Sequence, residues 1–314
     1  MNAPAKSADA HVRSTLPGMK ASGLHGGIRP LDLALAFALP TGAWMVSAGL
    51  PAWLRMWVLV GAEVLAVKWL MLRFALGRGE VPTCGRQIGF LFGWAGTDAT
   101  RFLRGGAEPV GLAEWAWAML HLLTGLVCAL AGAQLIATAP LTGAWLGMAG
   151  MVLAGHLGGT ELLALAWRSR GVDAPSLMRT PIAATSLADY WGARWNLAFA
   201  VPARDLLFKP LARRVGVAGA TLAAFAVSGV LHETVIALPA GGGWGWPTAY
   251  FLFQGTAVLV ERSRLGQALG LGKGLCGWVF VLVCTVGPAF WLFPPQFVER
   301  VVVPMLSALN PIPL

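Results

Sequence analysis

Two neighbouring residues able to carry out acid–base chemistry lie inside an apolar stretch of this sequence. His232 and Glu233 interrupt residues 217–238, where hydrocarbon side chains predominate. Ionisable groups are costly in hydrocarbon surroundings and commonly mark a functional site there. A neutral imidazole can take the proton of a hydroxyl group as that group begins to attack a carbonyl carbon, and desolvation favours the neutral form. We therefore interpret His232 as the candidate general base.

The spacing around His232 gives its neighbours different candidate roles. Ser228 and Gly229 precede His232 by one turn on the same helix face, where Ser228 could orient the ring and Gly229 permits close approach. Glu233 projects about 100° away from His232. For Glu233 a packing role and a catalytic role are therefore both open, and for His232 the alternative is a polar contact between helices.

A second group of candidate residues precedes this stretch, within residues 168–216. Ser186 and Asp189 have the spacing of a capping box and predict the start of a short helix. Aromatic, polar and basic residues follow: Tyr190, Trp191, Arg194, Trp195, Asn196, Arg204, Lys209, Arg213 and Arg214. Such a segment fits either an interfacial helix pair or an entrance that holds a phosphate-bearing substrate with its basic side chains.

The composition predicts that these elements belong to an integral membrane protein. The chain has 314 residues, of which 57% are hydrophobic and 12% are charged, and its mean hydropathy is +0.67. Residues 1–28 lack periodicity and are predicted to form a disordered tail, and residues 29–314 a single integral-membrane domain. The four cysteines have no metal-type spacing. The net charge is +9, but the basic residues do not form a basic-aromatic patch in a soluble domain, which disfavours nucleic-acid binding.

Apolar runs predict an all-α bundle of about seven or eight transmembrane helices. The seven runs cover residues 30–49, 53–74, 114–137, 143–167, 217–238, 247–261 and 275–293. Residues 296–314 could form an eighth span or an interfacial helix. Of the 23 Lys and Arg residues, 20 fall in the N-terminal tail and in alternate loops. The positive-inside rule therefore predicts a cytoplasmic N-terminus and a cytoplasmic segment 168–216.

Three segments resemble the wax-synthase-like branch of the membrane-bound O-acyltransferases. They read Ser186-Leu-Ala-Asp-Tyr-Trp-Gly-Ala-Arg-Trp-Asn196, then Ser228-Gly-Val-Leu-His-Glu233, and more loosely Phe90-Leu-Phe-Gly-Trp-Ala-Gly-Thr-Asp-Ala-Thr-Arg-Phe-Leu103. The two stronger motifs lie in the signature region 186–262. Tyr190 stands where the family usually has Phe, and Ala193 stands where plant members often have a basic residue.

The resemblance implies a helical bundle with an internal substrate tunnel and acyl transfer from acyl-coenzyme A to the hydroxyl of a lipophilic alcohol. His232 matches the family's catalytic histidine, and Asn196 matches its second signature polar residue. The predicted substrate contacts are Trp191, Arg194, Trp195, Arg204, Lys209, Arg213, Arg214, Ser228 and Glu233. No cofactor is implied, because acyl-coenzyme A is a co-substrate; the expected partners are this donor, the alcohol and membrane lipid.

Other polar residues in the apolar runs leave alternatives open. His121, His156, Glu161, Glu63 and Lys68 could belong to a proton or ion path, which would make the chain a transporter. A non-catalytic lipid-binding membrane protein would also fit the architecture. A metal site built from His121, His156 and His232 has no spacing signature.

Overall fold

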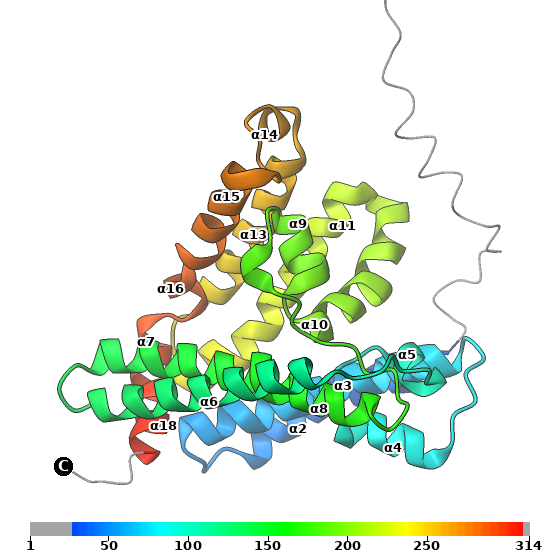
Figure 1. The fold of residues 1–314 in the computed structure, drawn as a ribbon, viewed down its shortest axis with the longest axis horizontal. Coiled ribbons are helices and arrows are strands. Elements are labelled where there is room, and N and C mark those ends of the chain that lie inside the picture. The colour runs from blue at the N-terminus through cyan, green and yellow to red at the C-terminus, as the bar shows by residue number, and fades with distance from the viewer. Residues whose placement is uncertain (1–26, 310–314) are drawn as a thin grey trace, which may run out of the picture.

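The computed structural model describes residues 27–309 and forms its regular structure from helices alone within that range (Figure 1). The predicted all-α class is thereby confirmed. In chain order the helices are α2 (Pro30–Val46), α3 (Ala52–Leu76), α4 (Cys84–Gly93), α5 (Ala99–Arg104), α6 (Leu112–Leu135), α7 (Pro140–Met151), the π-helix η2 (Val152–Gly159), α8 (Thr160–Arg168), the 3₁₀-helix η3 (Pro181–Ala183), α9 (Leu187–Asp189), the π-helix η4 (Tyr190–Arg194), α10 (Leu197–Pro202), the π-helix η5 (Ala203–Phe208), α11 (Lys209–His232), the π-helix η6 (Glu233–Ala237), α12 (Leu238–Ala240), α13 (Trp246–Arg262), α14 (Arg264–Ala268), α15 (Gly274–Val286), α16 (Ala289–Leu292), α17 (Pro295–Phe297), the π-helix η7 (Val298–Val302) and α18 (Val303–Ala308).

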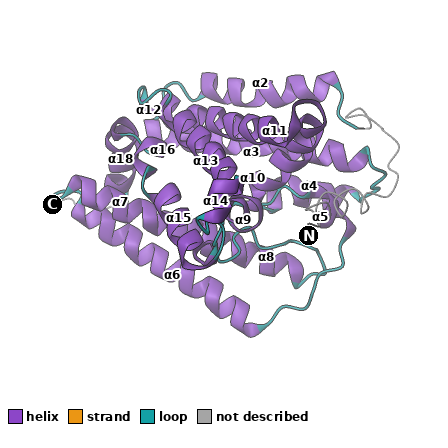
Figure 2. Ribbon diagram, turned by 90° about the horizontal axis from the view of Figure 1, so that it is seen from above, coloured by secondary structure: helices purple, strands orange, loops and turns teal. Residues whose placement is uncertain are grey.

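The helices form two tiers. In Figure 1, α2, α3, α6, α7 and α8 run along the lower tier, whereas α9, α11, α13, α14 and α15 rise above it. Figure 2 shows the same helices from above. Within the tiers α2 packs on α3, α6 on α7, and α11 on α13. The two tiers meet where η6 contacts α3, so the helix that carries the candidate histidine joins them.

Within residues 27–309, four helical stretches are long and apolar enough to cross a membrane. They are Leu112–Leu135, Pro140–Arg168, Leu197–Ala240 and Gly274–Leu292. The remaining predicted spans correspond to α2 and α13, each 17 residues long, and to α3, which has 25 residues but carries four charged ones. The structure therefore supports an integral membrane protein, and the count of seven or eight spans stays a prediction.

A turn at Gly216 divides the longest of these stretches. Gly216 has φ +75° and ψ 173°, which is outside the helical region and strained for residues with a Cβ. The turn separates the basic residues of η5 and early α11 from the apolar residues that begin at Val217. The predicted boundary between cytoplasmic segment and span therefore has a structural counterpart at this glycine.

Three apolar clusters hold the elements around the candidate site. Phe90, Phe102 and Leu177 are buried where α4 and α5 pack beneath the loop after α8. Ile236, Val301 and Leu306 are buried where η6 meets the C-terminal helices. Leu187, Val258 and Cys284 fix α9 against α13 and α15.

The structure describes the two ends of the chain only in part, so the predictions made for them are tested only in part. Residues 1–26 of the predicted tail lie outside the described residues, as do residues 310–314. The C-terminal helices from Pro295 to Ala308 bury Val301 and Leu306 completely, so this segment packs into the bundle along its described length.

Candidate active site

The imidazole of His232 has a fixed orientation. His232 ends α11, and its Nδ1 lies 2.7 Å from the carbonyl oxygen of Ser228, one turn earlier. Because a carbonyl oxygen only accepts hydrogen bonds, Nδ1 carries the proton and donates it. Nε2 is then left with its lone pair, as a general base requires. The ring also packs against Phe251, with 4.3 Å between the ring centroids.

His232 lines a cavity of about 540 Å³, called here the reaction cavity. Its walls come from α3, η2, α9, η4, α10, η5, α11, η6, α13, α16 and α17, so segments far apart in sequence meet at it. The predicted site residues that line it are Trp191, Trp195, Asn196, Arg204, Ser228 and His232. One cavity therefore brings together the two stronger sequence motifs.

The first of those motifs is held by hydrogen bonds to α13. Ser186 caps α9 as predicted, since its hydroxyl accepts a hydrogen bond from the Asp189 amide at 3.0 Å. The buried carboxylate of Glu261 accepts hydrogen bonds from the amides of Leu187 and Ala188. These bonds satisfy amides of the first turn of α9, which otherwise lack partners.

Trp191, which lines the reaction cavity, is held in place by a second polar contact with α13. Its indole nitrogen donates to the side-chain oxygen of Gln254 at 3.2 Å, and the amide of Gln254 donates to the carbonyl oxygen of Cys284 at 2.6 Å. Gln254 is completely buried. The bridge fixes the indole against Phe251, whose ring centroid is 5.7 Å away.

The backbone conformation of residue 196 is one reason why an asparagine is found there. Its φ of 45° and ψ of 63° lie in the left-handed region, which asparagine adopts more readily than most residues. The backbone N–H of Asn196 donates to the sulfur of Met178, with 3.2 Å between nitrogen and sulfur. The side chain lines the reaction cavity, where its NH₂ group can serve as a hydrogen-bond donor.

Glu233 lies outside the walls of the reaction cavity. Its carboxylate accepts hydrogen bonds from the amide of Thr248 at 3.0 Å, from the hydroxyl of Thr248 at 2.8 Å and from the amide of Gly245 at 3.2 Å. An acidic group at a helix N-terminus is favoured by the helix dipole. Of the two roles left open for Glu233, its contacts therefore match the structural one.

The predicted basic contacts separate into two groups. Arg204 lines the cavity and forms two hydrogen bonds with Asp205, which also pairs with Lys209. Arg194 pairs with Asp189 and donates to the carbonyl oxygens of Arg179 and Thr180, so it ties the motif to its own loop. Arg194, Lys209, Arg213 and Arg214 are not among the residues that line the cavity.

Ser228 acts differently from the initial expectation, whereas Gly229 permits a close approach as expected. The Ser228 hydroxyl donates to the carbonyl oxygen of Ala224 at 3.0 Å, so the backbone of Ser228, rather than its side chain, orients the imidazole. A Cβ on Gly229 would come within 2.7 Å of the Thr248 Cα. Gly229 thus allows the close approach of α13 that brings Phe251 to the ring.

Several cavity residues were not assigned to the site by the sequence reasoning. They are Glu63, His156, Phe199, Phe251 and Arg262. The sequence marked His156 and Glu63 as ionisable residues in apolar runs. Which cavity their side chains face depends on how the helices pack, and the sequence does not show that. Within the described residues, no group of three or more His, Cys, Asp or Glu side chains could hold a metal ion.

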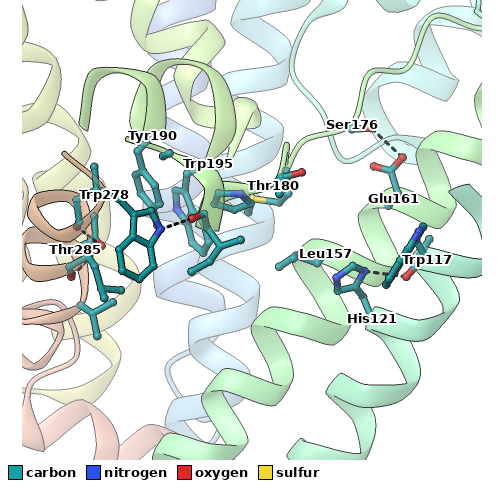
Figure 3. A pocket seen from close by; sticks show the side chains of 18 of the residues that line it. Trp117, His121, Leu157, Glu161, Ser176, Thr180, Tyr190, Trp195, Trp278 and Thr285 are labelled. Atoms are coloured by element: carbon teal, nitrogen blue, oxygen red, sulfur yellow. Dashed lines mark hydrogen bonds between the residues drawn. The ribbon is translucent and has the colours of Figure 1, made fainter. Parts of the chain in front are cut away.

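A second cavity of about 550 Å³, called here the side cavity, lies behind the same motif (Figure 3). Tyr190, Trp195 and Trp278 stand on one side of the view, and His121 and Glu161 on the other. The Trp195 ring stacks between Tyr190, at 5.6 Å, and His156, at 6.5 Å. Burial raises the pKa of the Tyr190 phenol above its usual range, so this wall stays uncharged.

The reaction cavity combines a base, a hydrogen-bond donor and a largely apolar chamber with an arginine on its wall. Nε2 of His232 can accept a proton, and the Asn196 amide can stabilise an oxygen that gains negative charge. Around them Val60, Val235 and Phe293 contribute apolar surface. This arrangement suits the transfer of an acyl group between two partly apolar molecules.

Comparison with known proteins shows what the chain is similar to. Residues 174–254 match the membrane bound O-acyl transferase family. The chain is 33% identical over 143 residues to a long-chain-alcohol O-fatty-acyltransferase of Simmondsia chinensis, covering 41% of this chain and 40% of that protein. It is 30% identical over 128 residues to acyl-CoA–sterol O-acyltransferase 1 of Arabidopsis thaliana, covering 37% of each chain.

A probable long-chain-alcohol O-fatty-acyltransferase 7 of Arabidopsis thaliana gives a similar match, with 30% identity over 150 residues, covering 41% of this chain and 42% of that protein. The matched part of the chain therefore spans about two fifths of the length of these curated relatives. The resemblance seen in the motifs is confirmed, and the family match covers both the residues around Asn196 and those around His232.

Proposed function

We propose that this chain, whose residues 174–254 match the membrane bound O-acyl transferase family, transfers an acyl group from acyl-coenzyme A to the hydroxyl of a lipophilic alcohol. The product is a wax-type or other lipid ester. The observation that carries the proposal is the imidazole of His232, whose Nδ1 is bonded to the Ser228 carbonyl and whose ring lines a cavity shared with Asn196.

In the proposed reaction Nε2 of His232 takes the proton of the alcohol as its oxygen attacks the thioester carbonyl carbon. The new C–O bond forms while the carbonyl oxygen gains negative charge, which the Asn196 amide stabilises by donating a hydrogen bond. The C–S bond then breaks. The coenzyme A thiolate leaves and receives the proton from the His232 imidazolium, which restores the neutral base.

Two arginines support a position for the donor. Arg204 and Arg262 come from different elements, and both line the reaction cavity. Guanidinium groups bind phosphate oxygens with two parallel hydrogen bonds, so this part of the cavity wall suits the phosphates of coenzyme A. In the proposed topology the N-terminus and these arginines lie on the cytoplasmic side, where acyl-coenzyme A is available.

The rest of the cavity supports a lipophilic acceptor. Its lining includes Met56, Val60, Val64, Val235, Ile236, Leu292, Phe293 and Phe297. Hydrocarbon chains gain free energy by leaving water for such a surface, and a dry chamber also suppresses hydrolysis of the thioester. Relatives named for long-chain alcohols and for a sterol agree with an acceptor of this class.

The test is ester formation by membranes that contain the protein, supplied with labelled acyl-coenzyme A and long-chain alcohols. We expect wild-type membranes to form the ester and His232→Ala to lower the rate by about 10²–10⁴-fold at equal protein abundance. His121→Ala is the matched control, because His121 also lies in a span but lines the side cavity. Full activity of His232→Ala would overturn the assignment of the base.

A further inference from the structure

The proposed reaction makes no use of a carboxyl group that also lines the reaction cavity. Glu63 lies in the middle of α3 with only 5% of its surface exposed. The cavity walls near it are apolar, since Val60 and Val64 flank it on α3 and Ile236 lies on η6, which packs against α3. A carboxyl group is costly in such surroundings unless it is paired, protonated or bound to a partner.

Ion pairing does not account for Glu63. Lys68 is the basic residue nearest to it on α3, and it is 99% buried. Its ammonium group donates to the carbonyl oxygens of Trp94 at 2.6 Å and Gly96 at 3.0 Å, and it lies over the Phe90 ring. Within the described residues Glu63 takes part in no salt bridge.

The Thr234 hydroxyl is the hydrogen-bond partner of Glu63. It donates to Oε1 of Glu63, and it also lies 2.7 Å from the carbonyl oxygen of Leu231. Because Glu63 has no ion pair, a protonated carboxyl group avoids placing an unpaired charge in this apolar wall. Since Oε1 accepts from Thr234, the proton of the neutral acid belongs on Oε2.

This arrangement leaves one oxygen of Glu63 for the cavity. Oε1 accepts from Thr234, so Oε2 carries the proton of the neutral acid and can donate it, and no hydrogen bond joins Oε2 to any residue in the described part of the chain. Among the described residues, the side-chain polar atoms that are fully enclosed and have no hydrogen-bond partner are Trp94 Nε1 and Arg168 Nε, and Oε2 of Glu63 is not one of them. Oε2 therefore has open surface, and the side chain lines the reaction cavity.

We infer that Glu63 is a specificity-determining residue that donates a hydrogen bond to a second hydroxyl group of the substrate. This inference rests on the proposed acyl transfer. Glu63 and His232 line the same cavity of about 540 Å³. A substrate whose reacting hydroxyl meets His232 can therefore bring a second hydroxyl to Glu63, as in a long-chain diol.

The test compares a long-chain 1,3-diol with the 1-alkanol of equal chain length as acceptors for the same labelled acyl-coenzyme A. The wild-type protein is expected to favour the diol in kcat/KM by about tenfold, the size expected for one buried hydrogen bond. Glu63→Gln is expected to keep the preference, because its carbonyl oxygen can accept from Thr234 while its NH₂ group donates into the cavity.

Glu63→Leu is expected to remove the preference while the 1-alkanol is still esterified, and Glu63→Met serves the same purpose if the leucine variant does not accumulate. Glu161→Gln is the matched control, since Glu161 lies in a span and lines the side cavity. A second arm pairs the 1-alkanol with a 3-hydroxyacyl donor. A Glu63-dependent preference in that arm places the second hydroxyl on the acyl chain instead of the acceptor.

The outcomes separate this inference from the proposed function. An unchanged ratio of diol to alkanol in the leucine and methionine variants refutes the role of Glu63 and leaves acyl transfer intact. Loss of the preference in Glu63→Gln refutes the neutral acid. The absence of any ester from wild-type membranes refutes the proposed function itself.

Discussion

Glu233 and Thr248 are joined by two hydrogen bonds that end on one carboxylate oxygen. Oε1 of Glu233 accepts both the amide and the hydroxyl of Thr248, while Oε2 accepts the amide of Gly245. The residue that follows the candidate base in sequence thus holds the start of α13. Phe251, one turn further along α13, then packs its ring on His232.

Glu233→Ala is therefore expected to lower the stability of the protein, and the rate of ester formation only weakly. Removing a helix-capping acceptor costs about 1 kcal/mol, and we expect a lower Tm for the purified protein in detergent. Ester formation per folded molecule should fall by less than about tenfold, because Glu233 does not line the reaction cavity. Glu233→Gln, which keeps one acceptor oxygen, is the control. A rate loss as large as that of His232→Ala with an unchanged Tm would instead make Glu233 catalytic.

Asn196 allows its backbone role to be separated from its side-chain role. Glycine adopts the left-handed conformation of residue 196 freely, so Asn196→Gly should fold normally and lose only the amide. If that amide stabilises the carbonyl oxygen, the rate should fall by about 10²–10³-fold.

Asn196→Ala adds a backbone penalty of about 1–2 kcal/mol to that loss. Thermal unfolding and ester formation measured on both variants distinguish the two roles. Asn196→Gly with wild-type activity would show that the residue serves the backbone alone.

Trp195 separates the reaction cavity from the side cavity, because it lines both. Trp195→Ala should join the two chambers and allow bulky polycyclic alcohols to compete with straight-chain ones. The same change should also lower stability, because it removes the ring that stacks on Tyr190 and His156. Trp195→Phe keeps a ring between Tyr190 and His156 and is the control. The measurement is the ratio of sterol ester to alkyl ester formed from mixed acceptors, and an unchanged ratio in Trp195→Ala would contradict the shared wall.

The sequence was most informative where chemistry depends on local spacing. His232, Asn196, Trp191 and Ser228 were predicted from two motifs, and one cavity contains all four. Contacts between helices could not be read in the same way. His156 and Glu161 are five residues apart, and they line different cavities because each faces another partner across the bundle.

The basic residues show the same limit of sequence reasoning. Five of them were equal candidates by composition, yet only Arg204 lines the cavity, joined there by Arg262 from α13. Arg204 lies in the π-helical turn of η5, and Arg213 and Arg214 lie just before the bend at Gly216; neither feature has a clear sequence signature. The basic segment was thus predictable as a region, whereas the individual contacts were not.

Gly216 provides a final prediction about how the base is positioned. Its φ of 75° places the start of the apolar part of α11, and His232 follows 16 residues later, about 24 Å along a helix. Gly216→Ala should destabilise the protein by about 1–2 kcal/mol, because a Cβ is strained in this conformation. Gly61→Ala in α3 is the matched control: Gly61 is helical and has nothing within 4 Å of an added Cβ. The control should be neutral or stabilising by up to about 1 kcal/mol. Tm values of the two variants in detergent check the difference, and equal Tm values would mean that the bend at Gly216 is not required.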